Sequence, residues 1–394
     1  MSSEKLETLL GKKALDALTR PTAAASGLPG PAFSSDEFYA LECERLFART
    51  WMCAGFGLDI PNPGDAMPVE LPGAPLLLVR GNDHQVRAFH NVCRHRGNIV
   101  LDKPCKAASV IACPYHRWTY ELTGELRATP HFGGNNVGFE GSGLDKSSLG
   151  LKPVRLVAWH DWLFVNLDGG APPFETYASG LIEHLQGYDF SKISVGAVRE
   201  FSFRSNWKNV AENFLETYHT HWVHPGLVNR YASVYKSDRD AADATRTKFQ
   251  NGTFFTSHLD LPPETEIETF GLPRITGQPD IWSHRLEYFF QFPNLIVFVE
   301  PGGVVSIIDY PRSAALTEQR WHLCFAKEAE NDTRYDEARM RTLDFWTEVN
   351  EEDIGVCETL QRGRASRAMD GGVFSPYWEG ESHGFQQLVI ESMR

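Results

Sequence analysis

The chain has 394 residues, which is long for a single compact core and indicates two domains. With 42% hydrophobic and 23% charged residues, it has the composition of a globular protein rather than of a disordered chain or a coiled coil. A formal charge of −13 argues against nucleic acid as a partner, because binding phosphates requires a basic surface. No apolar run approaches the roughly 18 residues of a membrane span, and no signal peptide is evident, so we expect a cytoplasmic protein without a membrane partner.

The first 50 residues are expected to be helical around a Pro/Gly/Ala-rich linker. Residues 1–20 read as a short amphipathic helix, and the spacing in 36–50 places apolar side chains on one helix face. These side chains are Phe38, Leu41, Leu46 and Phe47.

Residues 51–168 have a different texture, with short apolar runs separated by Pro-Gly, Gly-Asn and Asn-Asp turn signals, which predicts a small all-β domain. Residues 169–394 mix the two kinds of element. A helix is expected over about 206–222, a curved antiparallel sheet through 284–326, and a long helix over about 333–364, with a shorter one near the C-terminus. The fold class is therefore α+β. We assign residues 1–50 to the larger domain.

The β region contains two mixed Cys/His pairs, Cys93 with His95 and Cys113 with His116. A set of two cysteines and two histidines could bind either zinc or an iron–sulfur cluster. Each loop supplies one cysteine and one histidine, whereas zinc-finger histidines usually follow a cysteine pair. This alternation favours a two-iron cluster in which the cysteines hold one iron and the histidines the other. Histidine ligands raise the reduction potential of such a cluster above that of a cluster held by four cysteines.

A second cluster of candidate ligands lies in "NWKNVAENFLETYHTHWVHPG". On a continuous helix Glu212, Glu216 and His219 would share one face. His224 would lie about 140° away from His219 on a regular helix, so an end or bulge near Pro225 is expected to bring it back. Two histidines and one carboxylate form the ligand set of mononuclear non-haem Fe(II) oxygenases.

The carboxylate is expected from the long helix near the C-terminus, where Glu351, Glu352 and Asp353 follow one another. The plainer interpretation of such a run is a solvated acidic face.

Together, "CRHRG…CPYHRWTYELTGEL" and the later motif resemble the terminal oxygenase (α) component of Rieske-type non-haem iron oxygenases. The resemblance implies a small all-β Rieske [2Fe–2S] domain followed by a catalytic domain with a curved antiparallel sheet flanked by helices. It makes Cys93, His95, Cys113 and His116 the cluster ligands. Arg117 departs from the pattern, since many members have glycine there.

The same resemblance makes His219 and His224 ligands of a mononuclear non-haem Fe(II). It makes Glu216 a bridging carboxylate that carries electrons between a cluster histidine of a neighbouring subunit and an iron-ligand histidine of its own. Asp353 fits the third ligand position, with Glu352 as the rival. Glu358 and Gln361 complete that family pattern.

The resemblance also implies a homotrimer, and O₂ as co-substrate. The sequence contains no G-x-G-x-x-G opening a helix and no plant-type ferredoxin spacing, so electrons from NAD(P)H are expected through a separate reductase, either a ferredoxin or a flavin/iron–sulfur protein.

The substrate is expected to be a small organic molecule. The segment "NWKNVAENFLETYH" is most similar to the branch acting on glycine betaine, carnitine and choline, where hydroxylation leads to N-demethylation or C–N cleavage. Aromatic side chains could bind a quaternary ammonium or stack an aromatic ring, so an aromatic ring-hydroxylating mono- or dioxygenase is the alternative. A Rieske electron carrier without oxygenase activity and a zinc-stabilised binding module are further alternatives. The aromatic candidates are Phe201, Phe203, Phe254, Phe255, Trp282, Tyr288, Phe289, Phe290, Phe292 and Phe298.

Overall fold

The structure, a computed structural model, describes residues 2–138, 145–230, 246–261 and 267–394. The chain divides into two compact units. One unit comprises residues 47–171, and the other combines residues 1–46 with residues 172–394. Strands dominate the first unit and a helix-covered sheet the second, which confirms the α+β fold class.

The smaller unit contains a six-stranded and a three-stranded antiparallel sheet. The six-stranded sheet has the order β1-β9-β8-β4-β3-β2. Its strands are β1 (Met52–Phe56), β2 (Ala66–Leu71), β3 (Ala74–Arg80), β4 (Val86–His90), β8 (Pro153–Trp159) and β9 (Trp162–Asn166). The smaller sheet consists of β5 (Ile111–Ala112), β6 (Thr119–Tyr120) and β7 (Leu126–Ala128).

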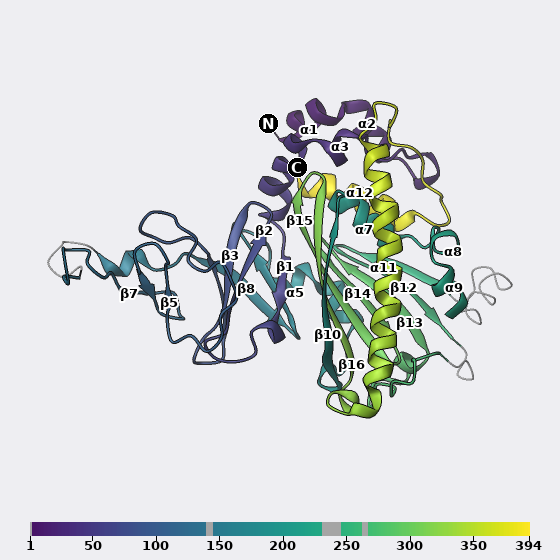
Figure 1. The fold of residues 1–394 in the computed structure, drawn as a ribbon. Coiled ribbons are helices and arrows are strands. Elements are labelled where there is room, and N and C mark those ends of the chain that lie inside the picture. Colours follow the sequence, from purple (N-terminus) through teal and green to yellow (C-terminus); the bar gives the residue numbers. More distant parts are fainter. Residues whose placement is uncertain (1, 139–144, 231–245, 262–266) are drawn as a thin grey trace. The chain divides into compact units, whose positions relative to one another are not determined.

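The larger unit is built on a seven-stranded antiparallel sheet with the order β10-β16-β15-β14-β13-β12-β11 (Figure 1). Most neighbours in the sheet are also neighbours in sequence, because short turns join β13 to β16 as predicted. The strands are β10 (Ile193–Phe203), β11 (Arg246–Asn251), β12 (Phe254–Asp260), β13 (Arg285–Gln291), β14 (Leu295–Glu300), β15 (Gly303–Ser313) and β16 (Leu316–Ala326).

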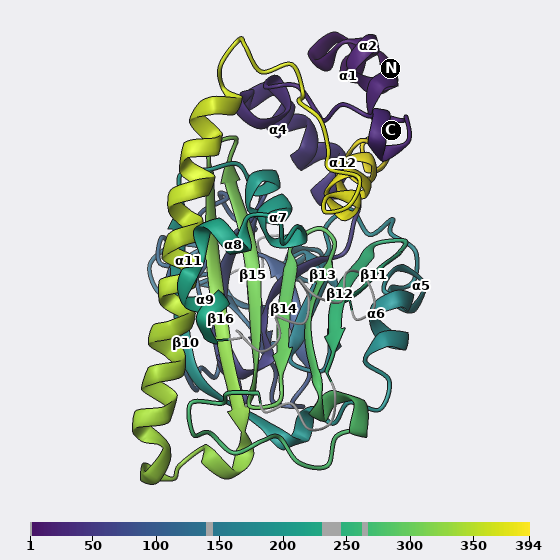
Figure 2. The same cartoon turned by 90° about the vertical axis from the view of Figure 1, so that its right-hand side faces the viewer.

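Helices cover this sheet, and α7, α8, α9 and α11 lie over the same face (Figure 2). None of the described helices is both long and apolar enough to cross a membrane. The helices are α1 (Ser2–Leu10), α2 (Lys12–Leu18), α3 (Pro31–Ser34), α4 (Asp36–Glu42), α5 (Phe174–Tyr177), α6 (Ser179–His184), α7 (Trp207–Leu215), α8 (Thr220–Val223), α9 (Pro225–Arg230), α11 (Asp336–Arg364) and α12 (Gly380–Ser392).

Two details differ from the helices expected near the N-terminus. The helix predicted over 1–20 breaks at Gly11, whose φ of 83° requires a residue without a Cβ, and so forms α1 and α2. The helical region expected over 36–50 runs from α4 into a short π-helical segment, Cys43–Phe47. Its four apolar side chains are buried, which confirms the predicted face.

The pleat of the sheet sorts aromatic side chains between its two faces. Tyr288 and Phe298 are directly opposed on β13 and β14, and both contact Phe214 of α7. The next residue, Phe289, instead contacts His184 of α6. The first set therefore lies on the face that α7 and α11 cover.

Gln361 joins the end of α11 to the start of α7. Its Oε1 accepts hydrogen bonds from Asn206 N at 3.0 Å and Asn209 Nδ2 at 2.8 Å, while its Nε2 donates to Phe33 O at 2.9 Å. Asn206 also caps α7 by accepting from Lys208 N. These bonds hold α11, which carries Asp353, against α7, the helix that precedes His219 and His224.

Candidate functional site

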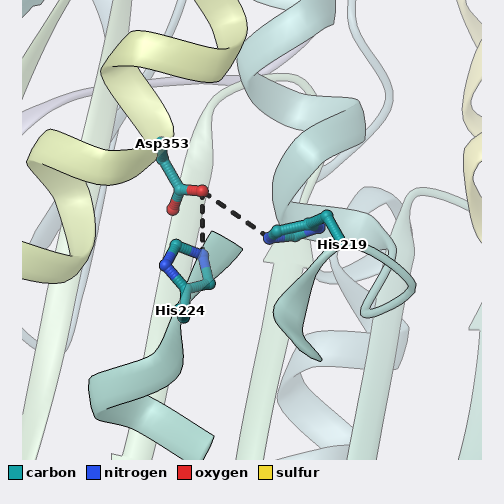
Figure 3. Close-up of side chains that lie close together, drawn as sticks. All are labelled: His219, His224 and Asp353. Carbon is teal, nitrogen blue, oxygen red and sulfur yellow. Dashed lines mark ion pairs between the residues drawn. The ribbon is translucent and has the colours of Figure 1, made fainter. Parts of the chain in front are cut away.

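His219, His224 and Asp353 meet between helices α8, α9 and α11 (Figure 3). One ligand atom from each residue lies within 4.8 Å of the others. Asp353 Oδ1 is 3.0 Å from His224 Nε2 and 3.6 Å from His219 Nε2. The side chains converge although Asp353 is far from both histidines in sequence.

The helix predicted over 206–222 is wrong in its second half, because α7 ends at Leu215. Glu216 is extended, with φ −117° and ψ 143°. Its carboxylate accepts hydrogen bonds from Tyr218 N and His219 N, which offers the backbone an alternative to the helical ladder. The chain resumes as α8 and leaves the helix again at His224, as Pro225 predicted. This break brings the two histidines together.

The break also corrects the shared face expected for Glu212, Glu216 and His219. Glu212 belongs to a separate buried network and accepts from Arg364 Nη2 at 2.7 Å and Gln386 Nε2 at 2.8 Å. Tyr218 is 51% and Trp222 84% exposed, so neither aromatic residue of this segment belongs to the core.

Two further carboxylates orient the imidazoles. Glu216 Oε1 lies 2.7 Å from His219 Nδ1, and Glu352 Oε2 lies 2.7 Å from His224 Nδ1. A carboxylate only accepts hydrogen bonds at neutral pH, so Nδ1 is the donor in each pair, and in the neutral imidazole that binds a metal Nε2 is then the atom with the lone pair. Carboxylates that hold metal-binding histidines in this way are common. Glu352 therefore contacts a histidine from behind, while Asp353 faces both Nε2 atoms.

The residues fit a divalent metal ion. Two Nε2 lone pairs face Asp353 Oδ1, a buried acceptor that receives no hydrogen bond from any described residue. Two imidazole nitrogens and a carboxylate oxygen that converge in this way suit a bound cation. Two imidazoles with one carboxylate are the set that suits Fe(II) with positions left open.

The Cys/His loops of the smaller unit have matching backbones. Cys93 N donates to Asn98 O at 2.8 Å and Gly97 N to Cys93 O at 3.0 Å. In the second loop the same positions repeat, with Cys113 N donating to Trp118 O at 2.9 Å and Arg117 N to Cys113 O at 3.0 Å.

The loops present their side chains as a mixed cluster requires. Both cysteines are buried free thiols, and the Cys93 Sγ lies 3.3 Å from Tyr120 Oη. The rings of His95 and His116 lie further out, with centroids 4.7 Å apart. His95 Nδ1 is buried and makes no hydrogen bond to the described residues. Two inner thiols and two outer imidazoles fit a two-iron cluster whose histidine side is exposed.

A cavity of about 160 Å³ lies beside the candidate metal ligands. His219, His224 and Asp353 form part of its wall, and most of the remaining wall is apolar. Its aromatic side chains are Phe203, Phe214, Tyr288, Phe298, Trp321 and Trp346.

Residues 189–394 match the family described as ring hydroxylating alpha subunit (catalytic domain), and residues 50–137 match the Rieske [2Fe–2S] domain. The first match alone spans more than half of the chain. The chain belongs to the ring-hydroxylating alpha subunit family. As a Rieske oxygenase α subunit it is an oxidoreductase with two cofactors, a Rieske [2Fe–2S] cluster and a mononuclear non-haem iron. These results confirm the predicted family, oxygenase class and cofactors.

The glycine betaine monooxygenase oxygenase subunit of Pseudomonas aeruginosa is 27% identical over 97% of this chain and 92% of its own length. Among solved structures, a quaternary ammonium Rieske monooxygenase studied for carnitine oxidation has a TM-score of 0.78 at 24% identity, covering 96% of this chain and 98% of its own. A Rhodococcus naphthalene 1,2-dioxygenase has a TM-score of 0.80 at 21% identity, covering 100% and 99%. Their fold is therefore shared.

Sequence reasoning missed several residues of this Rieske oxygenase site. Phe214, Trp321, Trp346 and Asn350 all line the cavity but were not among the aromatic or polar candidates. The helical period of α11 was a usable signal for two of them, since Asn350 lies one turn and Trp346 two turns before Asp353. Of the ten aromatic candidates, the cavity wall contains Phe203, Tyr288 and Phe298.

Proposed function

We propose that this Rieske oxygenase hydroxylates a small quaternary ammonium compound of the betaine, carnitine or choline type, with oxidative N-demethylation or C–N cleavage as the outcome. The observation that carries the proposal is the aromatic wall beside His219, His224 and Asp353. Phe214 contacts both Tyr288 and Phe298 edge to face, with ring centroids 5.5 Å and 5.1 Å away. Such rings attract a quaternary ammonium by about 0.5–2 kcal/mol per contact.

Cavity size supports the same substrate class. A volume of about 160 Å³ is close to that of an engineered cavity of about 150 Å³ that accommodates benzene. Similarity to a glycine betaine monooxygenase subunit over nearly the whole chain points the same way. Because the fold is shared with a naphthalene dioxygenase, the fold alone does not determine the substrate.

In the proposed site, His219 and His224 would hold the mononuclear iron through their Nε2 atoms, and Asp353 would hold it through its carboxylate. Iron bound there would activate O₂ beside the substrate. Glu216 and Glu352 keep the protons on the two Nδ1 atoms and thereby orient both Nε2 atoms toward Asp353.

Cys93, His95, Cys113 and His116 are proposed to hold the cluster. Glu216 is proposed to link the two centres, since it already binds His219 Nδ1, and its partner would be a cluster histidine of an adjacent subunit of a homotrimer. Electrons would come from NAD(P)H through a separate reductase. A cytoplasmic location also stays a prediction.

Purified protein supplied with reductase, NADH and O₂ tests the function. With glycine betaine, carnitine, γ-butyrobetaine and choline we expect consumption of O₂ and release of formaldehyde or of an aldehyde from C–N cleavage with at least one of them. Benzoate and naphthalene form the comparison panel. Hydroxylation of an aromatic member, with no turnover of any ammonium compound, would overturn the proposal in favour of a ring hydroxylase.

A further inference from the structure

The cavity wall formed by α11 contains two hydrogen-bond donors without an acceptor. Trp346 and Asn350 both line the cavity and are only 5% exposed. No described residue accepts a hydrogen bond from Trp346 Nε1 or from Asn350 Nδ2. Gln319 in the same wall differs, because its Nε2 donates to Asp309 and its Oε1 accepts from Trp321.

Helical geometry places this donor pair on the face that carries Asp353. Trp346, Asn350 and Asp353 stand at positions i, i+4 and i+7 of α11, which share one face of a helix. At a rise of 1.5 Å per residue, Asn350 lies about 4.5 Å and Trp346 about 10.5 Å from Asp353 along the helix axis. A group bound by the pair would thus be held at a short, fixed distance from the candidate metal ligands.

Leaving these donors unsatisfied is costly. A buried polar group without a hydrogen bond destabilises the fold, and native proteins contain few such groups. Indole N–H only donates, and the unpartnered atom of Asn350 is also a donor. The complementary ligand group is therefore an acceptor.

We propose that Trp346 and Asn350 bind the carboxylate of a zwitterionic substrate, a role that rests on the proposed function and narrows its substrate class to betaines that carry a carboxylate. A carboxylate has acceptor oxygens for both donors, whereas a hydroxyl would bring a further donor into an apolar wall. Phe298 of the aromatic cluster lies 5.0 Å from Trp346. One small molecule can thus place its cation against the rings and its carboxylate on the pair.

Arg230 is the neighbouring cation on this side of the cavity, and its charge is already balanced. Its guanidinium lies 6.0 Å from the Trp346 ring centroid and 3.0 Å from Glu300 Oε2. Both partners of this ion pair are buried, and breaking such a pair is strongly unfavourable. The neutral donors of α11 are therefore the groups that would favour a zwitterion with a carboxylate over a simple cation without one.

Calorimetric titration of the loaded enzyme with four probes tests the donor pair. Glycine betaine has a cation and a carboxylate, its methyl ester and tetramethylammonium lack the carboxylate, and 3,3-dimethylbutanoate has the carboxylate on an uncharged isostere. Asn350→Ala should lower the affinity for the two carboxylate probes about 10- to 100-fold, because a hydrogen bond to a charged group is lost. The affinity for tetramethylammonium should not change.

Asn350→Asp supplies the sharper test, because it keeps the shape and replaces a donor with a negative charge. It should abolish binding of the carboxylates and maintain or strengthen that of tetramethylammonium. Trp346→Phe should weaken the carboxylates selectively. Met340→Ala, an exposed position on the same helix, is the matched control and should change nothing. The cluster absorption of each variant reports that the protein is intact.

The proposed role of the donor pair would be overturned if Asn350→Ala lowered the affinity for all four probes equally. It would also be overturned if Asn350→Ala bound the carboxylate probes as tightly as the unaltered enzyme does. Failure of the proposed function looks different. In that case 3,3-dimethylbutanoate still binds in an Asn350-dependent way while no ammonium probe does. If no carboxylate probe binds the unaltered enzyme, the donor pair is overturned as well.

Discussion

At the scale of single residues, the position of the proton on each histidine determines which of its nitrogen atoms can bind a metal ion. Glu216 and Glu352 hold the two Nδ1 protons, so both Nε2 lone pairs are aimed at Asp353. Asp353 and Glu352 are adjacent in sequence and chemically almost equivalent, yet they lie on opposite sides of the imidazoles. The two carboxylates should therefore respond differently to substitution.

Asp353→Asn is expected to remove the mononuclear iron, because a neutral amide is a poor ligand for a hard cation, and so to abolish turnover. Glu352→Gln keeps all three proposed ligands and should weaken iron binding about 10- to 100-fold, as expected for an orienting partner. Iron analysis should change from about three to about two per chain in Asp353→Asn, with the cluster absorption retained. If Glu352→Gln loses the iron and Asp353→Asn does not, the two roles are reversed.

Arg117 has a backbone conformation that usually favours glycine. It occupies the position in its loop that Gly97 occupies in the other, and both have positive φ, 58° and 75°. A non-glycine residue in this conformation costs about 1–2 kcal/mol, while glycine costs about 0.5–1 kcal/mol in unfolded-chain entropy. Arg117→Gly should thus be neutral or stabilising by up to about 1 kcal/mol.

Arg96→Gly is the matched control for Arg117→Gly, because Arg96 lies in the companion loop without a positive φ. It should destabilise by about 0.5–1 kcal/mol. Thermal unfolding of the loaded protein, followed by cluster absorption, measures both changes. A clear loss of stability in Arg117→Gly would show that the guanidinium makes an interaction worth more than the backbone strain.

At the scale of elements, a buried ion pair joins α4 to α7. Lys208 and Glu42 are both fully buried, and the Lys208 Nζ is 2.5 Å from Glu42 Oε1. Burial raises the pKa of Glu42 and lowers the pKa of Lys208. Phe33, Phe38 and Trp207 surround the ammonium group. The N-terminal helices are thereby tied to the helix that precedes the iron motif.

Lys208→Met should destabilise the larger unit by about 3–5 kcal/mol, because it leaves an unpaired carboxylate in the interior. The double variant Lys208→Met with Glu42→Gln should recover much of this loss, since no buried charge remains. Urea unfolding of the two single variants and the double variant measures the coupling. Additive losses would show that the two residues contribute independently.

The element scale also shows where helical periodicity misleads. The apolar pattern of 206–222 continues through Glu216, and only the side-chain hydrogen bonds to Tyr218 N and His219 N interrupt it. Such capping bonds depend on a side-chain conformation that the spacing does not reveal. α11, in contrast, was predicted within a few residues, because the hydroxyls of Thr342 and Thr359 donate to carbonyls one turn back and leave its backbone N–H ladder in place.

At the scale of the whole molecule, Asp309 links stability to pH. It is buried in β15, accepts one hydrogen bond from Gln319 Nε2, and burial raises its pKa to about 7. In the unfolded chain its pKa is near 4. Between these values the folded protein retains a proton that the unfolded chain has lost, so stability decreases as the pH rises from about 4 to about 7.

Asp309→Asn should remove this contribution, because the amide is neutral at every pH and has nearly the same shape. The variant should gain stability relative to the unaltered protein as the pH rises from 5 to 8, by up to about 1.4 kcal/mol per pH unit. Urea midpoints measured across this range give the comparison. Parallel curves for both proteins would mean that Asp309 is ionised in the folded state.

The sequence by itself determined the chemistry of the protein. Cys/His loops separated by a β segment, two histidines after an acid, and an acidic run on a long helix indicate the donor types and the two iron centres, because ligand identity and local spacing are properties of the chain. The β texture and the antiparallel strands through 284–326 likewise follow from turn residues and alternation.

Only the tertiary structure decided which atoms meet. The face of α11 that turns toward His219 and His224 depends on Gln361 and the packing of α7. The family spacing favoured Asp353 over Glu352, but only the packing places Asp353 Oδ1 beside both Nε2 atoms and Glu352 beside a Nδ1 atom. The cavity wall draws Phe214, Tyr288, Phe298, Trp346 and Asn350 from four separate elements. Contacts between distant segments arise from the packing of the sheet against its helices, and local patterns do not encode their geometry.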